Sequence, residues 1–570
     1  MVSVRGLIRT SLALGLVCTI GAPSTAGAQE FGGGPPPYTP AAGAKDLKSV
    51  LFNWTWHMGM LRGIDEHELM ASLEYQASGT VQVNGQPCTL MKYRVSTNYQ
   101  TPGQRIQYAC TRSGQTHSAI EVVSGPYAWN EDIAGAELIA GQGKATPMPN
   151  AVAERLIRFW AGPQGAPKAA LQGTKEPDPG QLKEGGDKIG ATSVAWEGGK
   201  PVVTFPIPGV AGATAVATLD DKFMAERVVV KQESTTTEFT YADYQDWNNP
   251  LNKVEALYAG KVVERRNGTV VRDLTTTETE TGNVYVVVPV PASVKAAIKV
   301  ATPPPPVLTL ARAEPPAQSA QPTPRTANGK PDLTGNWISG GMNWRYGNRR
   351  CGPTQAEGCS EAWNQTIDFE WEAPSRYGPN RPLYRPENWD KVQQLDMWTN
   401  KEDPVMTCQP LGIPRHGPPR RIVQSASDVI FFYGQYADGG GGQGEYRIVP
   451  TDGRKHDEKQ ARETQYMGYT VGRWEGDTLV LDSVSFNDYT WLARGGFFHS
   501  DQMRVVEKFT RKGNEILYEV TVEDPVVLVE PWVMTPRTLR MLPDADAGLL
   551  PERGNCEVYE LEDIATQIRH

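Results

Sequence analysis

The sequence has few cysteines and histidines, no basic block and no long apolar run beyond its first residues. Cysteine and histidine each occur 7 times in 570 residues, and no Cys-x-x-Cys pair is present, so we expect neither a metal site nor any other cofactor. No cluster of Lys and Arg stands out against a net charge of -9, which argues against nucleic acid as a partner. No stretch after the leader is long and apolar enough for a membrane span.

Glycine and proline, by contrast, are abundant. The 57 glycines and 45 prolines are typical of many turns and loops, and therefore of a mainly β protein. Hydrophobic residues make up 39% and charged residues 21%, as in ordinary globular proteins. The length predicts two to four domains and leaves the oligomeric state open.

Residues 1–28 have the form of a Sec-type signal peptide. Arg5 and Arg9 supply the positive start, Ser11 to Ala22 forms a short apolar run, and Ala26-Gly27-Ala28 matches the small-residue cleavage pattern. The residues before Cys18 are not those of a lipoprotein signal. We therefore expect a periplasmic or secreted bacterial protein, with residues 29–43 as a flexible leader.

The mature chain keeps six cysteines, an even number that favours disulfides in an exported protein. Cys88 and Cys110 precede the proline-rich segment and are expected to pair with each other. Among the other four, we favour Cys351 with Cys359 and Cys408 with Cys556, although the sequence permits three pairings.

The first domain is expected over residues 44–300. Its start predicts a helix over 44–63, followed by strands at Leu73–Val83 and Cys88–Val95 that flank an Asn84-Gly85 turn. A further strand is predicted at Val284–Val288. The segment Tyr241-Ala242-Asp243-Tyr244-Gln245-Asp246-Trp247, with the later Asp273-Leu274-Thr275, resembles the lipoprotein-carrier type of curved half-barrel (α+β). That resemblance implies a concave face that holds a lipid or other apolar molecule.

A proline-rich linker is predicted over residues 301–326. The second domain, 327–570, contains eight or nine evenly spaced strand patterns from Arg421 onward, which predict an antiparallel, lipocalin-like β-barrel. It resembles a family of uncharacterised exported bacterial proteins, and the resemblance brings no activity. The motifs that carry it include Asp452-Gly453-Arg454-x-His456, Gly472-Arg473-Trp474-Glu475-Gly476-Asp477-Thr478, Phe486-Asn487-Asp488 and His499-Ser500. Arg415-His416-Gly417 departs from the family, where we expect apolar and small residues.

Two polar loops of the second domain are predicted to share one mouth of the barrel, because successive loops of a meander alternate between its ends. A histidine near neutral pKa beside a carboxylate is a candidate acid–base pair. The candidate catalytic residues are His456, His499, Asp488 and Glu507, and the candidate substrate-binding residues are Arg454, Asn487, Trp491 and Ser500.

Three functions fit this sequence. The first is a cofactor-independent acid–base hydrolase or lyase that acts on a small organic molecule at the mouth. The second is a non-catalytic periplasmic carrier for an apolar small molecule or lipid, and the third is an envelope scaffold. The same residues also fit a structural role, in which Asn487 and Asp488 form a turn, Trp491 plugs the barrel and Glu507 pairs with Arg454.

Overall fold

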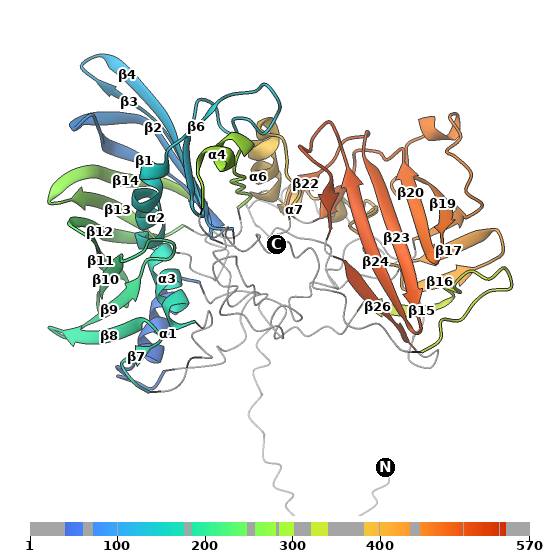
Figure 1. Ribbon diagram of the computed structural model, residues 1–570, viewed down its shortest axis with the longest axis horizontal. Coiled ribbons are helices and arrows are strands. Elements are labelled where there is room, and N and C mark those ends of the chain that lie inside the picture. Colours follow the sequence, from blue (N-terminus) through green and yellow to red (C-terminus); the bar gives the residue numbers. More distant parts are fainter. Residues whose placement is uncertain are drawn as a thin grey trace, which may run out of the picture.

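The chain forms two large antiparallel sheets, each with its own core (Figure 1). The computed structural model describes residues 40–60, 72–99, 101–175, 182, 185–247, 257–280, 284–300, 321–339, 381–397, 399–433, 445–493, 495–534 and 536–542. The predicted signal peptide, most of the predicted linker and the expected last strand lie outside these ranges. The observed architecture is mainly β, with a curved first sheet and a nearly closed second one, which confirms the predicted fold class.

The first sheet has 14 strands in the order β6-β5-β4-β3-β2-β1-β14-β13-β12-β11-β10-β9-β8-β7. Strands β1 to β6 form one half of the sheet in chain order. Strands β7 to β14 form the other half, and β14 pairs with β1. The strands are β1 Ser72–Val83, β2 Gln86–Asn98, β3 Gly103–Arg112, β4 Gln115–Ser124, β5 Tyr127–Glu131, β6 Ala145–Pro147, β7 Lys188–Ile189, β8 Thr192–Glu197, β9 Lys200–Pro206, β10 Thr214–Leu219, β11 Ala225–Gln232, β12 Thr235–Asp246, β13 Leu257–Arg266 and β14 Thr269–Glu280.

The turn between β1 and β2 is the one that the sequence predicts. Asn84 has φ 52° and Gly85 has φ 72°, so both central residues adopt the left-handed conformation that a two-residue hairpin requires. Asparagine and glycine tolerate this conformation best. The hairpin register therefore follows from local sequence.

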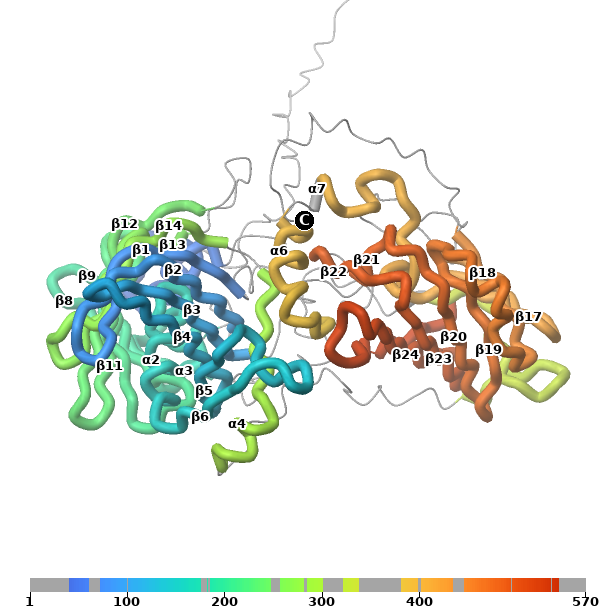
Figure 2. Tube along the Cα trace, turned by 90° about the horizontal axis from the view of Figure 1, so that it is seen from above, coloured from blue at the N-terminus to red at the C-terminus, as the bar shows by residue number. Residues whose placement is uncertain are grey.

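Three helices cover one face of the first sheet: α1 (Leu47–His57), α2 (Val152–Ala161) and α3 (Gly165–Thr174). Figure 2 shows the sheet curving around α2 and α3. Asp46 begins α1 by accepting a hydrogen bond from the backbone N–H of Ser49 at 3.1 Å. Apolar side chains of the helices and of the concave face form one continuous core.

The opposite face of the first sheet packs against the segment 284–290, which the sequence predicted to contain a strand. It is extended but joins no ladder, because its carbonyl groups accept hydrogen bonds from side chains. Ser72 Oγ donates to the carbonyl of Val284, and Asn98 Nδ2 donates to that of Val286. The short helix α4 (Ala292–Ala297) follows.

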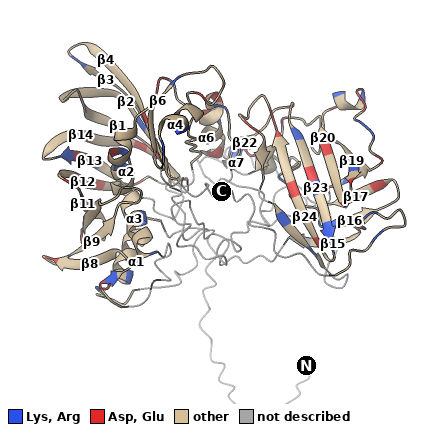
Figure 3. Cartoon of the chain, viewed as in Figure 1, with Lys and Arg blue, Asp and Glu red and all other residues tan. Residues whose placement is uncertain are grey.

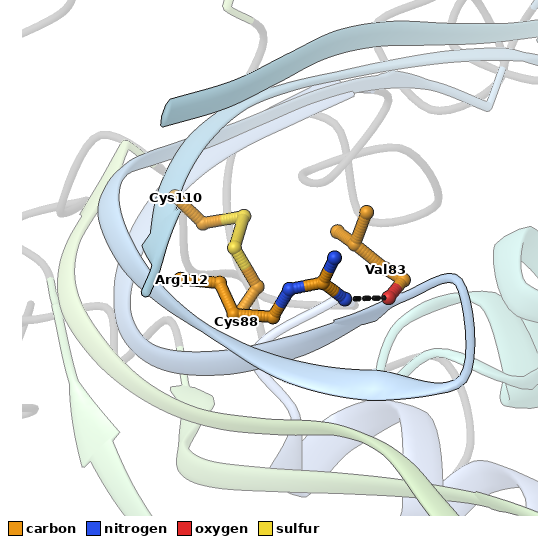
Figure 4. The surroundings of a disulfide bond; sticks show 4 residues. All are labelled: Val83, Cys88, Cys110 and Arg112. Atoms are coloured by element: carbon orange, nitrogen blue, oxygen red, sulfur yellow. Dashed lines mark hydrogen bonds between the residues drawn. A yellow bond between two sulfur atoms is a disulfide. The ribbon is translucent and has the colours of Figure 1, made fainter. Parts of the chain in front are cut away.

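The predicted disulfide between Cys88 and Cys110 is present and joins β2 to β3 (Figure 4). Its Cα atoms are 5.6 Å apart, and both side chains are buried in the core. Beside it, Arg112 donates to the carbonyl of Val83 at 2.7 Å. Cys408 is also disulfide-bonded, whereas Cys351, Cys359 and Cys556 lie outside the described residues, so its pairing stays a prediction.

The second sheet has ten strands, with nine in the order β18-β17-β16-β15-β26-β24-β23-β20-β19 and β25 paired to β24. The two ends of this path, β18 and β19, lie side by side, so the sheet nearly closes. The strands are β15 Gly335–Ser339, β16 Arg421–Gln424, β17 Asp428–Phe432, β18 Tyr446–Pro450, β19 Tyr469–Glu475, β20 Thr478–Val484, β23 Arg504–Lys512, β24 Glu515–Glu523, β25 Trp532–Val533 and β26 Arg537–Leu542. A separate pair comprises β21 Trp491–Ala493 and β22 Phe497–Phe498.

Helix α6 (Trp389–Met397) lies between the two sheets and contacts the first one (Figure 1). Its Gln393 donates to the carbonyl of Tyr285, and the Arg105 guanidinium lies 4.6 Å from the centroid of the Trp389 ring. A short helix, α7 (Thr399–Glu402), follows. The proposed domain boundaries stay a prediction, but side chains from both sides of the linker contact each other.

Charges of both signs are distributed over both sheets (Figure 3). Within the described ranges, no helix is long and apolar enough to cross a membrane.

Candidate functional site

The concave face of the first sheet carries a cluster of buried tyrosines beneath the helices. The rings of Tyr75 on β1 and Tyr258 on β13 have centroids 4.9 Å apart, and Tyr93 on β2 lies 6.3 Å from Tyr75. Tyr99 contacts Phe159 of α2 at 5.0 Å. Burial raises the pKa of each of these four tyrosines, so all four stay protonated and present an apolar ring together with a neutral hydroxyl.

A group of charged side chains lies against the same face. Arg158 of α2 donates from Nε to Oε2 of Glu264 on β13 at 2.9 Å, and Arg272 on β14 donates to the same oxygen at 2.9 Å. Arg272 also donates to Glu121 on β4 at 3.1 Å. Burial alone would raise the pKa of Glu264, but the two guanidinium groups lower it to about 2. Glu264 is therefore ionised at neutral pH.

Our sequence-based expectations did not include this group, because most of its members are far apart in the chain. Glu121, Arg158, Glu264 and Arg272 come from three strands and one helix. The sequence does contain one indication of this group. In β13 and β14, Glu264 and Arg272 lie on the face that otherwise carries apolar residues such as Val262 and Leu274.

The loops of the predicted mouth lie at the end of the second sheet where β20 finishes. The first follows β18 and carries His456, and the second precedes β23 and carries His499. His456 is half-buried, and its Nε2 donates to the carbonyl of Asp482 at 3.0 Å. Its ring is 5.1 Å from that of Tyr469.

His499 is buried and makes different contacts. Its Nδ1 donates to the carbonyl of Ser500 at 2.9 Å, so its Nε2 is left to accept from the hydroxyl of Thr490 at 2.7 Å. Burial lowers the pKa of His499, and the carboxylates of Asp524 and Asp488 offset this in part. No contact among the described residues joins the two histidines, and their catalytic role stays a prediction.

The other predicted site residues have local partners. Arg454 pairs with Asp452 at 2.6 Å on the surface. Asn487 is buried and accepts from the backbone N–H of Tyr489, as in a turn. Asp488 is exposed.

The last two predicted binding residues, Trp491 and Ser500, have partners within the second domain as well. Trp491 is buried in the second core, as the structural alternative expected. The Ser500 hydroxyl donates to Asp524 at 2.9 Å.

Glu507 belongs to a buried polar group inside the second sheet. Arg447 on β18 pairs with it at 2.7 Å, and Tyr518 on β24 donates to it at 2.8 Å. Arg447 also donates to the hydroxyl of Tyr433 at 2.8 Å. The ion pair between Glu507 and Arg454 that the sequence suggested is therefore not formed. Strand β18 contains one indication of this group. Arg447 points inward, whereas the apolar Ile448 that follows it faces outward.

His416 lies beside this group. It is fully buried, its Nε2 is 2.9 Å from Oε2 of Glu445, and its ring centroid is 4.5 Å from that of Tyr433. Arg415 forms a buried ion pair with Asp403 at 2.7 Å. Arg415 and His416, which depart from the family pattern, are thus both buried, and each lies beside a carboxylate.

Comparison with known proteins identifies distant structural likenesses only. No family model and no curated protein matches the chain. A LolA superfamily protein from Nitrosomonas europaea matches 42% of this chain and 94% of its own, at 7% identity and a TM-score of 0.23. A DUF1329 family protein from Desulfovibrio piger matches with the same coverage and identity, at a TM-score of 0.24. Neither match identifies a substrate.

Proposed function

We propose that this chain is a binding or carrier protein that holds an apolar small molecule or lipid against the concave face of its first sheet. The observation that carries the proposal is the continuity of the apolar lining. Fully buried side chains under the helices, such as Val81 and Val95, are followed by partly exposed ones in Val83, Leu90 and Tyr108. An apolar molecule would cover these side chains and remove them from water.

The tyrosines suit a bound molecule that has both apolar and polar parts. A protonated tyrosine offers an apolar ring and one hydroxyl, so such a lining accepts an apolar body and an occasional polar atom. The rigid frame around them, with a disulfide between β2 and β3, limits the conformational entropy lost when a molecule binds.

Probe displacement tests the proposal. An environment-sensitive naphthylamine probe should fluoresce with the mature protein and be displaced by fatty alcohols or esters. Leu90→Asp and Val83→Asp should each weaken binding by at least about tenfold, because a charge would be desolvated beside the occupant.

Ile448→Asp is the matched control, since Ile448 is 58% exposed on the second sheet. It should leave probe binding unchanged. Equal loss in all three variants, or no probe binding by a folded wild-type protein, would reject the proposal.

We also infer that the chain works outside the cytoplasm, in the periplasm or as a secreted protein. The Cys88–Cys110 disulfide supports this, because disulfides persist in oxidising compartments. Cell fractionation of the tagged protein tests it. The hydrolase or lyase hypothesis for the second sheet stays a prediction. His456 and His499 each hydrogen-bond to a backbone carbonyl.

A further inference from the structure

The charged group on the concave face contains more positive than negative charge. We define the buried charge cluster as Arg155, Arg158, Arg272, Glu121 and Glu264. Arg155 donates to the carbonyls of Val122 and Trp129 and to Asn130 Oδ1, and among the described residues it donates to no carboxylate. Three guanidinium groups therefore face two carboxylates, which leaves one positive charge over.

The nearest charges outside the cluster do not change this balance. Glu154 accepts from Arg158 Nη2 at 2.9 Å and from Arg266 at 2.9 Å, and adding this carboxylate together with the Arg266 guanidinium still leaves a surplus of one positive charge. Their side chains are 42% and 33% exposed, so water screens them, whereas the Glu264 side chain is only 2% exposed. A surplus charge in a buried group is unfavourable unless another charge offsets it.

Two N–H donors of the cluster have no acceptor. Arg158 Nη1 comes no closer than 3.9 Å to Glu121 Oε2, and it makes no hydrogen bond within the described part of the chain. The same holds for Arg272 Nε. Both atoms are buried. Water could accept from either donor, but it would leave the surplus charge in place.

The surroundings of the cluster combine apolar rings with partial access to solvent. The positive charge of Arg272 acts on the hydroxyl groups of Tyr75, Tyr93 and Tyr108. Tyr108 is half-buried, and the Glu121 side chain is 21% exposed. The cluster therefore borders the partly exposed apolar lining described above.

We infer that the molecule held on the concave face is an amphipathic monoanion whose carboxylate is bound by Arg158 and Arg272, an inference that rests on the proposed function. A carboxylate accepts two charge-assisted hydrogen bonds from guanidinium groups. Its single charge offsets the single surplus charge of the cluster. A phosphate dianion would leave one negative charge over, and an ester would leave the positive charge in place.

Competition among three ligands with the same alkyl chain tests the inference on the full mature protein. The ligands are dodecanoate, methyl dodecanoate and dodecyl phosphate, each displacing the fluorescent probe at neutral pH. Dodecanoate should bind at least about tenfold more tightly than the methyl ester. Dodecyl phosphate should bind more weakly than dodecanoate.

Two substitutions change the charge balance in opposite directions. Arg272→Gln removes the surplus and should abolish the preference for dodecanoate over its ester. Glu121→Gln adds one positive charge and should increase that preference, and it keeps the inference testable if Arg272→Gln fails to fold. Glu475→Gln, an exposed change on the second sheet, should leave the preference as in the wild type.

The outcomes separate the two proposals. Binding of all three ligands with equal affinity, or a preference for the phosphate, would overturn the carboxylate inference and leave the carrier function standing. If none of the ligands and no probe binds, the carrier function itself fails. An unchanged preference in folded Arg272→Gln and Glu121→Gln proteins would also overturn the carboxylate inference.

Discussion

His499 is kept neutral by its burial. In the neutral ring, Nδ1 donates to the carbonyl of Ser500 and Nε2 accepts from the hydroxyl of Thr490. Burial lowers the pKa of His499 below its ordinary value near 6.5. These contacts suit a residue that stabilises a loop.

This arrangement predicts a pH-dependent stability. A free histidine in the unfolded chain takes up its proton near pH 6.5, whereas His499 in the folded chain does so only at lower pH. The stabilising contribution is therefore full above pH 6.5 and falls as the pH drops toward the folded pKa, by at most about 1.4 kcal/mol per pH unit. His499→Gln should reduce this slope in urea unfolding curves, while His456→Gln, at a half-buried ring, should not. Equal slopes for wild type and His499→Gln would contradict the assignment.

Gly79 in β1 permits a close approach of two strands. It has φ 127°, and a Cβ atom there would lie 2.0 Å from the carbonyl oxygen of Asp273 on β14. Gly79→Ala should lower the free energy of unfolding by roughly 2–4 kcal/mol, because it adds both backbone strain and a clash with backbone. Gly85→Ala is the control, since Gly85 also has positive φ but faces open space. Similar losses in the two variants, measured by denaturant unfolding, would rule out the clash.

At the scale of elements, the disulfide fastens the open end of the β2–β3 hairpin. Cys88 and Cys110 are 22 residues apart, and the chain-entropy account assigns a loop of this length roughly 3 kcal/mol. The double substitution of Cys88 and Cys110 by Ser should lower the melting temperature by several degrees. Reducing agent should not lower the melting temperature of that variant through positions 88 and 110, because no disulfide joins them. Mass spectrometry that detects a free Cys88 or Cys110 thiol in the native protein would contradict the bridge.

Elements with strong local signals were predictable. The Asn84-Gly85 turn, helix α1 and strands β1 and β2 lie where the sequence places them, because a turn residue or a periodic pattern indicates each one. Strand β15 was missed, because it is short and its partner β26 is about 200 residues away. The segment Val284–Val288 was predicted as a strand, but it joins no ladder, and side chains donate to its carbonyl groups instead.

At the scale of the whole molecule, the two halves of the chain contact each other through both buried and exposed side chains. Tyr285, which precedes the linker, packs in the core of the second sheet and donates to the carbonyl of Pro382. Arg381 donates to the carbonyl of Val284, and Arg94 pairs with Asp390. The two halves therefore share an interface that the linker alone would not impose.

Limited proteolysis should cut first within residues 301–326, where the sequence is proline-rich. We expect the two fragments to stay folded and to elute together on size exclusion. The packing of Tyr285 in the second core and the hydrogen bond from Gln393 to its carbonyl join the two fragments. Tyr285→Ala combined with Trp389→Ala should let the nicked fragments separate. Fragments that separate in the wild type would show that the interface is weak, and fragments that unfold would show that the boundary is misplaced.

The sequence by itself determined the class of fold, the first disulfide and the elements with local periodicity, because each depends on residues close in the chain or on a single cysteine pair. It also pointed to Glu507, but not to its partner. Only the tertiary structure decided that Glu507 pairs with Arg447, and that Arg158, Glu264, Arg272 and Glu121 meet beneath α2. Such groups depend on strand order and on which face each side chain takes, and neither can be read from the spacing of the residues along the chain.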